Sequence, residues 1–152
     1  MQQNEDAIPV EIDFIDPRSM DLDERHAVKM FLGKTFEQAE AMFKENFLFY
    51  QEDLSCMRAK AFRFYVLPAI RYLLSDAANG DSDAVSTFCY VLESRLKNDP
   101  EAIKPIIPIV IDAINQFLDR FGRYDCSIEI YGDVQGRYGR VLQQLTERAA
   151  DH

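Results

Sequence analysis

The sequence predicts an all-α fold, a single-domain bundle of about six helices. Three observations lead to this prediction. Apolar side chains recur at helical spacing in six segments of the 152-residue chain, and typical helix-start residues precede several of them. Nothing alternates strand with helix as a parallel sheet requires. A hydrophobic fraction of 47%, with eleven Phe and seven Tyr, indicates a bulky, ordered core.

The first residues differ from the rest. We expect residues 1–20 to form an acidic extended arm or a short edge strand, ahead of a helical domain at residues 21–149. A short run alternates apolar and polar residues with the period of two that is typical of a strand, although no partner strand is evident. The apolar members of this run are Ile8, Val10, Ile12 and Phe14.

A helical pattern begins at Asp21 and ends at Gly33, because glycine readily stops a helix. This first helix is expected to place one set of side chains on a common side: Leu22, His26, Met30 and Phe31.

The second helix should begin after a capping box, in which the Thr35 hydroxyl and the Gln38 amide satisfy backbone donors. Its spacing predicts a helix over residues 36–46. Residues 48–54, aromatic and then acidic without a clear period, are expected to form a buried turn.

The clearest helical face follows, and it contains Pro68. A proline removes a backbone donor and crowds the carbonyl four residues back, so the sequence predicts either a kink or two abutting helices. The seven apolar positions of this face are Phe62, Tyr65, Val66, Ala69, Ile70, Leu73 and Leu74.

Three further helices have recognisable starts. Asp81 or Ser82 can cap the next helix, and Asp99 followed by proline suits another start. After Asp99, Pro105 and Pro108 predict either a short helix before a long one or a single irregular helix. Asp133 should cap the last helix, and the apolar positions of these helices are Val85, Phe88, Cys89, Leu92, Leu96, Ile103, Ile106, Ile107, Val110, Ile111, Ile114, Phe117, Leu118, Phe121, Val134, Tyr138, Val141, Leu142 and Leu145.

The net charge of −9 is concentrated at the start of the chain. Residues 1–25 hold eight acidic and two basic side chains, so they carry six of the nine net negative charges. Such a segment repels nucleic acid and anionic membranes and attracts a basic protein. We therefore expect a protein partner, contacted through five acidic residues: Asp13, Asp16, Asp21, Asp23 and Glu24.

Other features point to a cytoplasmic protein. The three cysteines are widely spaced and odd in number, which is typical of reduced thiols. Residues 1–6 do not resemble a secretory signal, and no stretch approaches the roughly 18 apolar residues of a membrane span.

No set of residues predicts catalysis, a metal site or a cofactor. Asp23 and His26 form only half of the arrangement that di-metal bundles use, and no second acid-x-x-His motif exists. An alternative is a small pocket beside Pro68, because kinked helices open spaces between neighbours. Its polar residues would be Glu52, Asp53, Arg63 and Tyr65.

The segment Ala-Phe-Arg-Phe-Tyr-Val-Leu-Pro-Ala at residues 61–69 resembles one found in small, uncharacterised bacterial helical proteins. The upstream Tyr-Gln-Glu-Asp-Leu at residues 50–54 is also similar to what precedes it there. Val66 is an extra residue relative to that pattern. The resemblance implies an all-helical fold, and some such acidic proteins look like immunity proteins, which neutralise toxins by binding them.

Three functions remain open from the sequence. The leading hypothesis is a non-enzymatic interaction module, of the immunity or inhibitor type, that binds a basic partner. The alternative is a ligand-binding or enzymatic helical domain with its pocket at the Pro68 kink. A self-associating helical bundle is the third.

Overall fold

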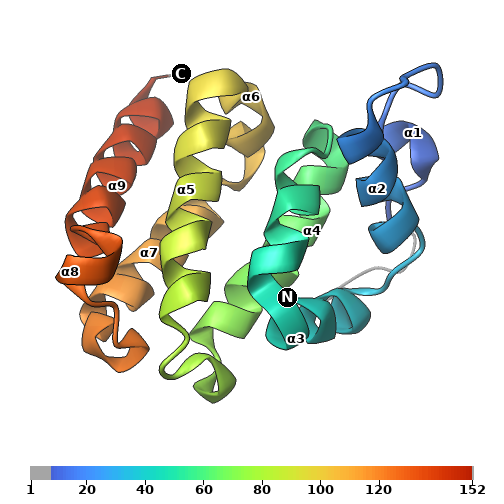
Figure 1. Cartoon of the computed structure of the whole chain (residues 1–152). Helices are drawn as coiled ribbons and strands as arrows, with labels where there is room; N and C mark the ends of the chain where they lie inside the picture. Colours follow the sequence, from blue (N-terminus) through green and yellow to red (C-terminus); the bar gives the residue numbers. More distant parts are fainter. Residues whose placement is uncertain (1–7, 152) are drawn as a thin grey trace. The chain divides into compact units, whose positions relative to one another are not determined.

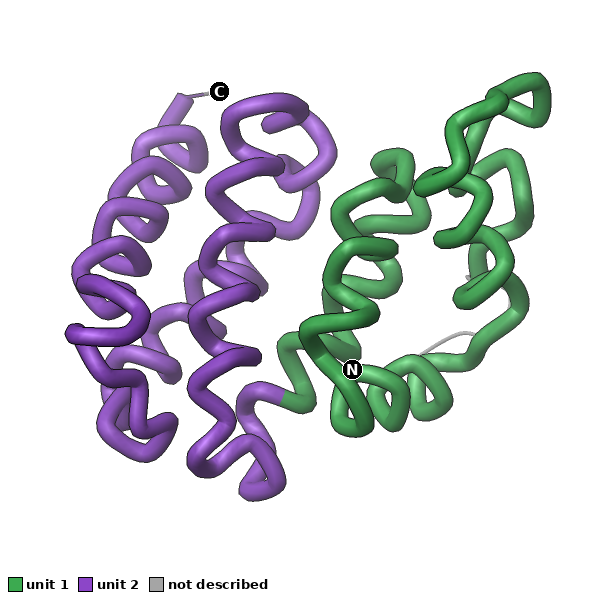
Figure 2. Tube along the Cα trace, in the orientation of Figure 1, with its two compact units in different colours: residues 1–72 green, residues 73–152 purple. Residues whose placement is uncertain are grey.

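The computed structural model describes residues 8–151, and these residues are helical with no strand among them (Figure 1). The predicted all-α bundle of about six helices is therefore confirmed. The chain divides into two units, Met1–Tyr72 and Leu73–His152, which Figure 2 distinguishes by colour. Residues 1–7 of the predicted arm, which include Glu5 and Asp6, lie outside the described residues.

Between residues 8 and 151, no helix combines the length and the apolar character that crossing a bilayer requires.

Unit 1 is built from four helices around aromatic side chains: α1 (Glu11–Phe14), α2 (Leu22–Phe31), α3 (Phe36–Ser55) and α4 (Ala59–Leu74). Tyr65 lies at the centre of this core. Its ring centroid is 5.1 Å from that of Phe31 and 5.6 Å from that of Phe14. Its hydroxyl lies 2.9 Å from the carbonyl oxygens of both Phe31 and Lys34, where α2 ends. One buried side chain thus joins α4 to the end of α2.

The prediction of an edge strand in residues 1–20 is wrong for residues 8–20, which the structure describes, because Glu11–Phe14 forms a single helical turn. The backbone of this turn is satisfied locally: the Val10 amide donates to the Asp13 carboxylate at 2.9 Å. Phe14 and Ile15, which are consecutive, are both buried, and Ile12 is exposed. A period of two could not bury two neighbours, and no strand is present among residues 8–151 to pair with this one.

Helix α3 is longer than predicted, and the segment at residues 48–54 is helical where a buried turn was expected. The predicted end at Asn46 does mark a break, because Asn46 has φ −159° and ψ 83°. Its side-chain oxygen accepts a hydrogen bond from the Phe49 amide at 3.1 Å, as an N-cap does. The helix therefore restarts at Asn46, and this second half carries the buried Asp53.

Helix α4 runs through Pro68 as one element, so the chain does not split into two abutting helices there. Six of the seven predicted apolar positions are buried, and Leu74 is half-buried. A proline inside a helix costs about 3 kcal/mol. Burial of each large apolar side chain returns about 1.5–3 kcal/mol, so the buried face outweighs the proline.

Unit 2 contains α5 (Ser82–Asn98), α6 (Pro100–Ile103), α7 (Ile107–Asp119), α8 (Ile128–Tyr131) and α9 (Val134–Ala150). Three 3-10 turns connect them: η2 (Asp76–Ala78), η3 (Lys104–Ile106) and η4 (Phe121–Tyr124). Helix α9 packs on α5 and α7, and the α5 and α9 positions predicted to face inward are buried, except the half-buried Leu142. The short helix before the long one matches the first alternative for Pro105 and Pro108.

The predicted caps of unit 2 are only partly confirmed. Asp81 and Asp133 accept hydrogen bonds from the Ala84 and Gly136 amides at 3.2 and 2.9 Å. Asp99 lies at the start of α6 but makes no capping hydrogen bond. Its carboxylate lies 3.7 Å from the guanidinium of Arg95, one turn earlier in the chain. The ion pair with the preceding helix replaces the cap.

Arg123 closes the end of α4 within unit 2. Its guanidinium donates to the carbonyl oxygens of Leu73 and Ser75 and to the Asn79 side chain, and it stacks 4.3 Å from the Tyr124 ring centroid. Helix-end carbonyls lack partners within the helix, and a cation complements the helix dipole there.

Replacing Arg123 with Ala should lower the free energy of unfolding by about 2–4 kcal/mol, because the partly buried carbonyls of Leu73 and Ser75 lose a charged donor. Urea unfolding followed by circular dichroism measures this loss. Arg120→Ala is the matched control, since Arg120 is exposed and its side chain makes no hydrogen bond within residues 8–151. Equal stability of the two variants would contradict the role assigned to Arg123.

Candidate functional site

The five predicted partner-binding acids all lie at the start of unit 1, and four of them have local partners. Asp13 lies 3.6 Å from the Lys60 ammonium, and Asp16 lies 3.2 Å from the Arg18 guanidinium. Hydrogen bonds from Arg18 lower the pKa of Asp16. Asp21 caps α2 by accepting from the amides of residues 23 and 24 at 2.9 and 3.0 Å.

The other two acids differ from each other. Glu24 accepts a hydrogen bond from the Ser19 hydroxyl at 2.6 Å. The carboxylate of Asp23 is exposed and makes no hydrogen bond or ion pair within residues 8–151. Part of the predicted negative charge is therefore balanced by cations or used by the fold, and Asp23 remains available to a partner.

Large apolar side chains are exposed between these acids, a feature that the sequence analysis missed. The exposed fraction is 88% for Met20, 83% for Leu22, 61% for Ile12 and 59% for Val10. Leu22 was predicted to face inward with His26, and that prediction is wrong. The buried positions of α2 are Ala27, Val28 and Phe31, which turns Leu22 outward. We call residues 10–24 the acidic–apolar segment.

His26 and Asp53 form the shortest side-chain contact between α2 and α3. The imidazole Nδ1 lies 2.6 Å from Asp53 Oδ1, and the His26 side chain is 40% exposed whereas that of Asp53 is only 4% exposed. The His26 ring also meets the edge of Phe49, with centroids 5.6 Å apart. The pair therefore fixes the middle of α2 on the second half of α3.

The environment of Asp53 is unfavourable for its charge. Burial raises the pKa of this carboxyl group, and the hydrogen bond from His26 opposes the increase. Asp53 Oδ2 is buried without a hydrogen bond in the described structure. The neighbouring charges of Glu52 and Asp23 raise the pKa further.

A histidine oriented by a buried carboxylate can act as a general base when a nucleophile lies beside it. The thiol of Cys56 is not activated for this role, because burial and the charges of Asp21, Asp23, Asp53 and Glu24 raise its pKa to about 11. The thiolate is the reactive form, so Cys56 is a poor nucleophile near neutral pH. The geometry thus favours a structural pair.

No metal-binding cluster of three or more His, Cys, Asp or Glu side chains occurs in the part of the chain that the structure describes.

The alternative pocket at Pro68 gains no support from the described contacts. Tyr65 is buried with its hydroxyl on two backbone carbonyls, and Asp53 is paired with His26. Glu52 is exposed, and Arg63 is half-buried on α4. The Tyr65 hydroxyl and Asp53 Oδ1 already have partners, and this alternative stays a prediction.

The sequence analysis considered His26 with Asp23 only as half of a metal motif, and it predicted no partner for His26. Asp23 lies three residues before it on the same helix, whereas the observed partner, Asp53, is 27 residues away. Asp53 is unusual in the sequence because it lies beside Glu52 among aromatic residues. No nearby residue predicts that His26 is its partner.

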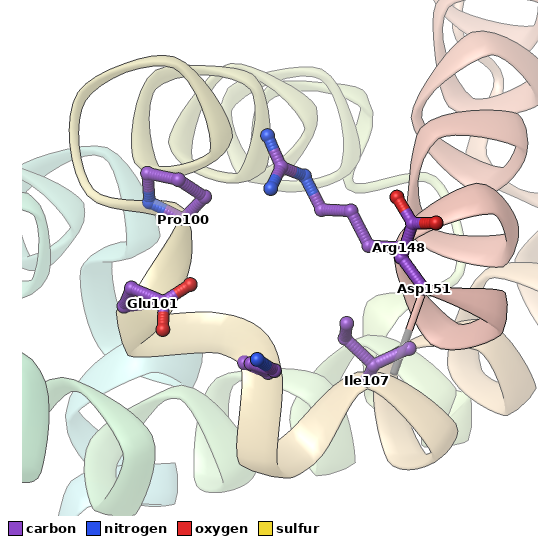
Figure 3. Close-up of a pocket in the computed structure, with 6 residues that line it drawn as sticks. Pro100, Glu101, Ile107, Arg148 and Asp151 are labelled. Carbon is purple, nitrogen blue, oxygen red and sulfur yellow. The ribbon is translucent and has the colours of Figure 1, made fainter.

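A second site lies in unit 2, where sequence reasoning placed none. A pocket of about 170 Å3 opens between the α6–η3–α7 segment and the end of α9 (Figure 3). Two carboxylates, two cations and two apolar residues line it: Pro100, Glu101, Lys104, Ile107, Arg148 and Asp151.

Comparisons with protein-family models, with curated protein sequences and with solved structures give no significant match to this chain. The resemblance of residues 61–69 to bacterial helical proteins therefore stays an expectation.

The buried charge of Asp53 predicts a specific pH dependence of stability. Because the folded state raises this pKa above the usual 3.8, the folded chain binds more protons at Asp53 than the unfolded chain just above that pH. The contribution of Asp53 to the free energy of unfolding should therefore fall as the pH rises from 3.8 toward neutrality.

Asp53→Asn keeps an oxygen that can accept from His26 and removes the titration. Urea unfolding of both proteins at several pH values should show the wild type losing stability relative to Asp53→Asn as the pH rises. A difference that stays constant, or that grows in favour of the wild type, would contradict the assignment.

Proposed function

We propose that the chain is a non-enzymatic, cytoplasmic interaction protein of the immunity or inhibitor type, and that its acidic–apolar segment binds a basic protein. The observation that carries the proposal is the exposure of Met20 and Leu22 on either side of Asp21, next to the unpaired Asp23. Exposed apolar patches rimmed by polar residues are typical of protein-binding surfaces, and Met20 and Leu22 are the most exposed large apolar side chains among residues 8–151.

Charge and apolar area have different roles in this proposal. A negative surface speeds the encounter with a basic partner, and it selects against acidic ones. Burial of an apolar side chain contributes about 25 cal/mol for each Å2 removed from water, before the entropic cost of association is subtracted. Met20 and Leu22 therefore serve as anchors, and Asp23 orients the partner.

The local structure supports a preformed surface. Asp21 caps α2 directly between the two apolar anchors, and the Arg25 guanidinium donates to the carbonyl oxygens of Ser19 and Pro17. These bonds hold the turn that presents Met20. A rigid surface loses less conformational entropy on binding than a flexible one.

The double substitution Met20→Ser and Leu22→Ser tests the proposal. Both side chains are exposed, so folding should be unaffected, and Ile128→Ser with Ile130→Ser in unit 2 is the matched control because those residues are 70% and 75% exposed. The three proteins are immobilised, and lysate of the source organism is passed over them. One basic protein should be retained by the wild type and the control and lost from the Met20/Leu22 variant.

The purified partner then allows a titration against salt. Affinity should fall between about 0.05 M and 0.5 M salt, because screening weakens exposed charges. Asp23→Asn should reduce that salt dependence. Equal retention of the partner by all three proteins, or acidic proteins alone in the eluate, would overturn the proposal.

A further inference from the structure

The pocket of unit 2 has two charged walls. Pro100, Glu101 and Lys104 come from α6 and η3, and Arg148 and Asp151 come from the end of α9. In Figure 3 the Arg148 guanidinium extends from α9 toward Pro100, and Glu101 lies on the opposite side from Asp151.

The four charged side chains of this pocket have no ion pair or side-chain hydrogen bond among residues 8–151: Glu101, Lys104, Arg148 and Asp151. Elsewhere in unit 2, opposite charges do meet. Arg137 lies 2.5 Å from Glu93, and Arg95 lies 3.7 Å from Asp99. Two cations and two carboxylates around one gap, all unpaired, leave both kinds of charge for a ligand.

The mixture of charges defines the class of ligand. A free phosphate or sulfate would be repelled by Glu101 and Asp151, and a divalent cation would be repelled by Lys104 and Arg148. A molecule that carries both a carboxylate and an ammonium group avoids both repulsions. Arginine binds carboxylates through two parallel hydrogen bonds, which suits Arg148 to the anionic end.

The volume of the pocket and its apolar lining residues narrow the class of ligand further. About 170 Å3 is below the 300–1,000 Å3 of usual ligand pockets, so the ligand must be small. The two apolar lining residues are Pro100 and Ile107, of which Ile107 is only 3% exposed.

We propose that this pocket binds a small zwitterion, a free α-amino acid with a short aliphatic side chain. Arg148 binds its carboxylate, Glu101 binds its ammonium group, and Pro100 and Ile107 border its side chain. The site lies in unit 2 and is independent of the function proposed for the acidic–apolar segment.

Three small molecules of nearly equal shape test separately whether the pocket recognises the carboxylate and the ammonium group. L-valine carries both charges, 3-methylbutanoate lacks the ammonium group, and isobutylamine lacks the carboxylate. Each is titrated into the full chain labelled with 15N, and the amide shifts of residues 100–107 and 148–151 are followed. L-valine should give saturable shifts there, with each analogue binding at least about ten-fold more weakly, the factor that loss of one charged contact produces.

Substitutions then test which side chain binds the carboxylate of L-valine and which binds its ammonium group. Arg148→Gln should weaken L-valine about ten-fold and leave isobutylamine unchanged, whereas Glu101→Gln should weaken L-valine and leave 3-methylbutanoate unchanged. Arg140→Gln is the matched control, because Arg140 is an exposed arginine of α9 outside the pocket.

Two results would overturn the proposal. Absence of saturable shifts with L-valine would remove the site, and binding of 3-methylbutanoate as tightly as L-valine would reduce it to an anion site. All substituted residues are exposed, and unchanged thermal unfolding of the variants confirms that they fold.

Discussion

Three buried tyrosines join the helices of this protein by donating their hydroxyl protons to backbone carbonyls. Tyr65 reaches the end of α2, Tyr124 reaches Leu73 at the end of α4, and Tyr138 reaches Val85 in α5. Burial raises the pKa of all three, so the hydroxyls remain protonated donors. An unpaired buried hydroxyl would cost about 1–3 kcal/mol, so each tyrosine tolerates only packings that supply an acceptor.

The acidic–apolar segment depends on this constraint. Tyr65 fixes the last turn of α2, and the contact of His26 with Asp53 fixes its middle. The orientation of the helix therefore cannot change without exposing or unpairing a buried polar atom. With Ala27 and Phe31 facing the core, the helical period places residue 22 outward. Leu22 is thus exposed because the other end of α2 buries Ala27, Val28 and Phe31.

Sequence reasoning succeeded where one local signal decided the outcome. Spacing predicts the face of α4, and residue type predicts the cap Asp133. For the cap Asp81 and the short helix before Ile107, the structure selects one of two predicted alternatives. Sequence reasoning failed where contacts between residues far apart in the sequence determine the structure. Leu22 has the apolar character of a core residue but is exposed. His26 has an acid one turn away on α2, but it contacts Asp53 of α3. The pocket beside Arg148 joins segments more than forty residues apart, so no local pattern announces it.

Net charge alone would have overstated the negative surface. Asp13 and Asp16 face Lys60 and Arg18, and Asp21 is engaged in capping α2, so three of the five candidate acids already have structural roles. Ion pairs on the surface contribute little energy, but they do reduce the field that a partner meets. What distinguishes this segment from an ordinary solvated acidic leader is therefore its apolar content. Under the proposed function, the exposed Met20 and Leu22 supply the apolar contact area that charge alone lacks.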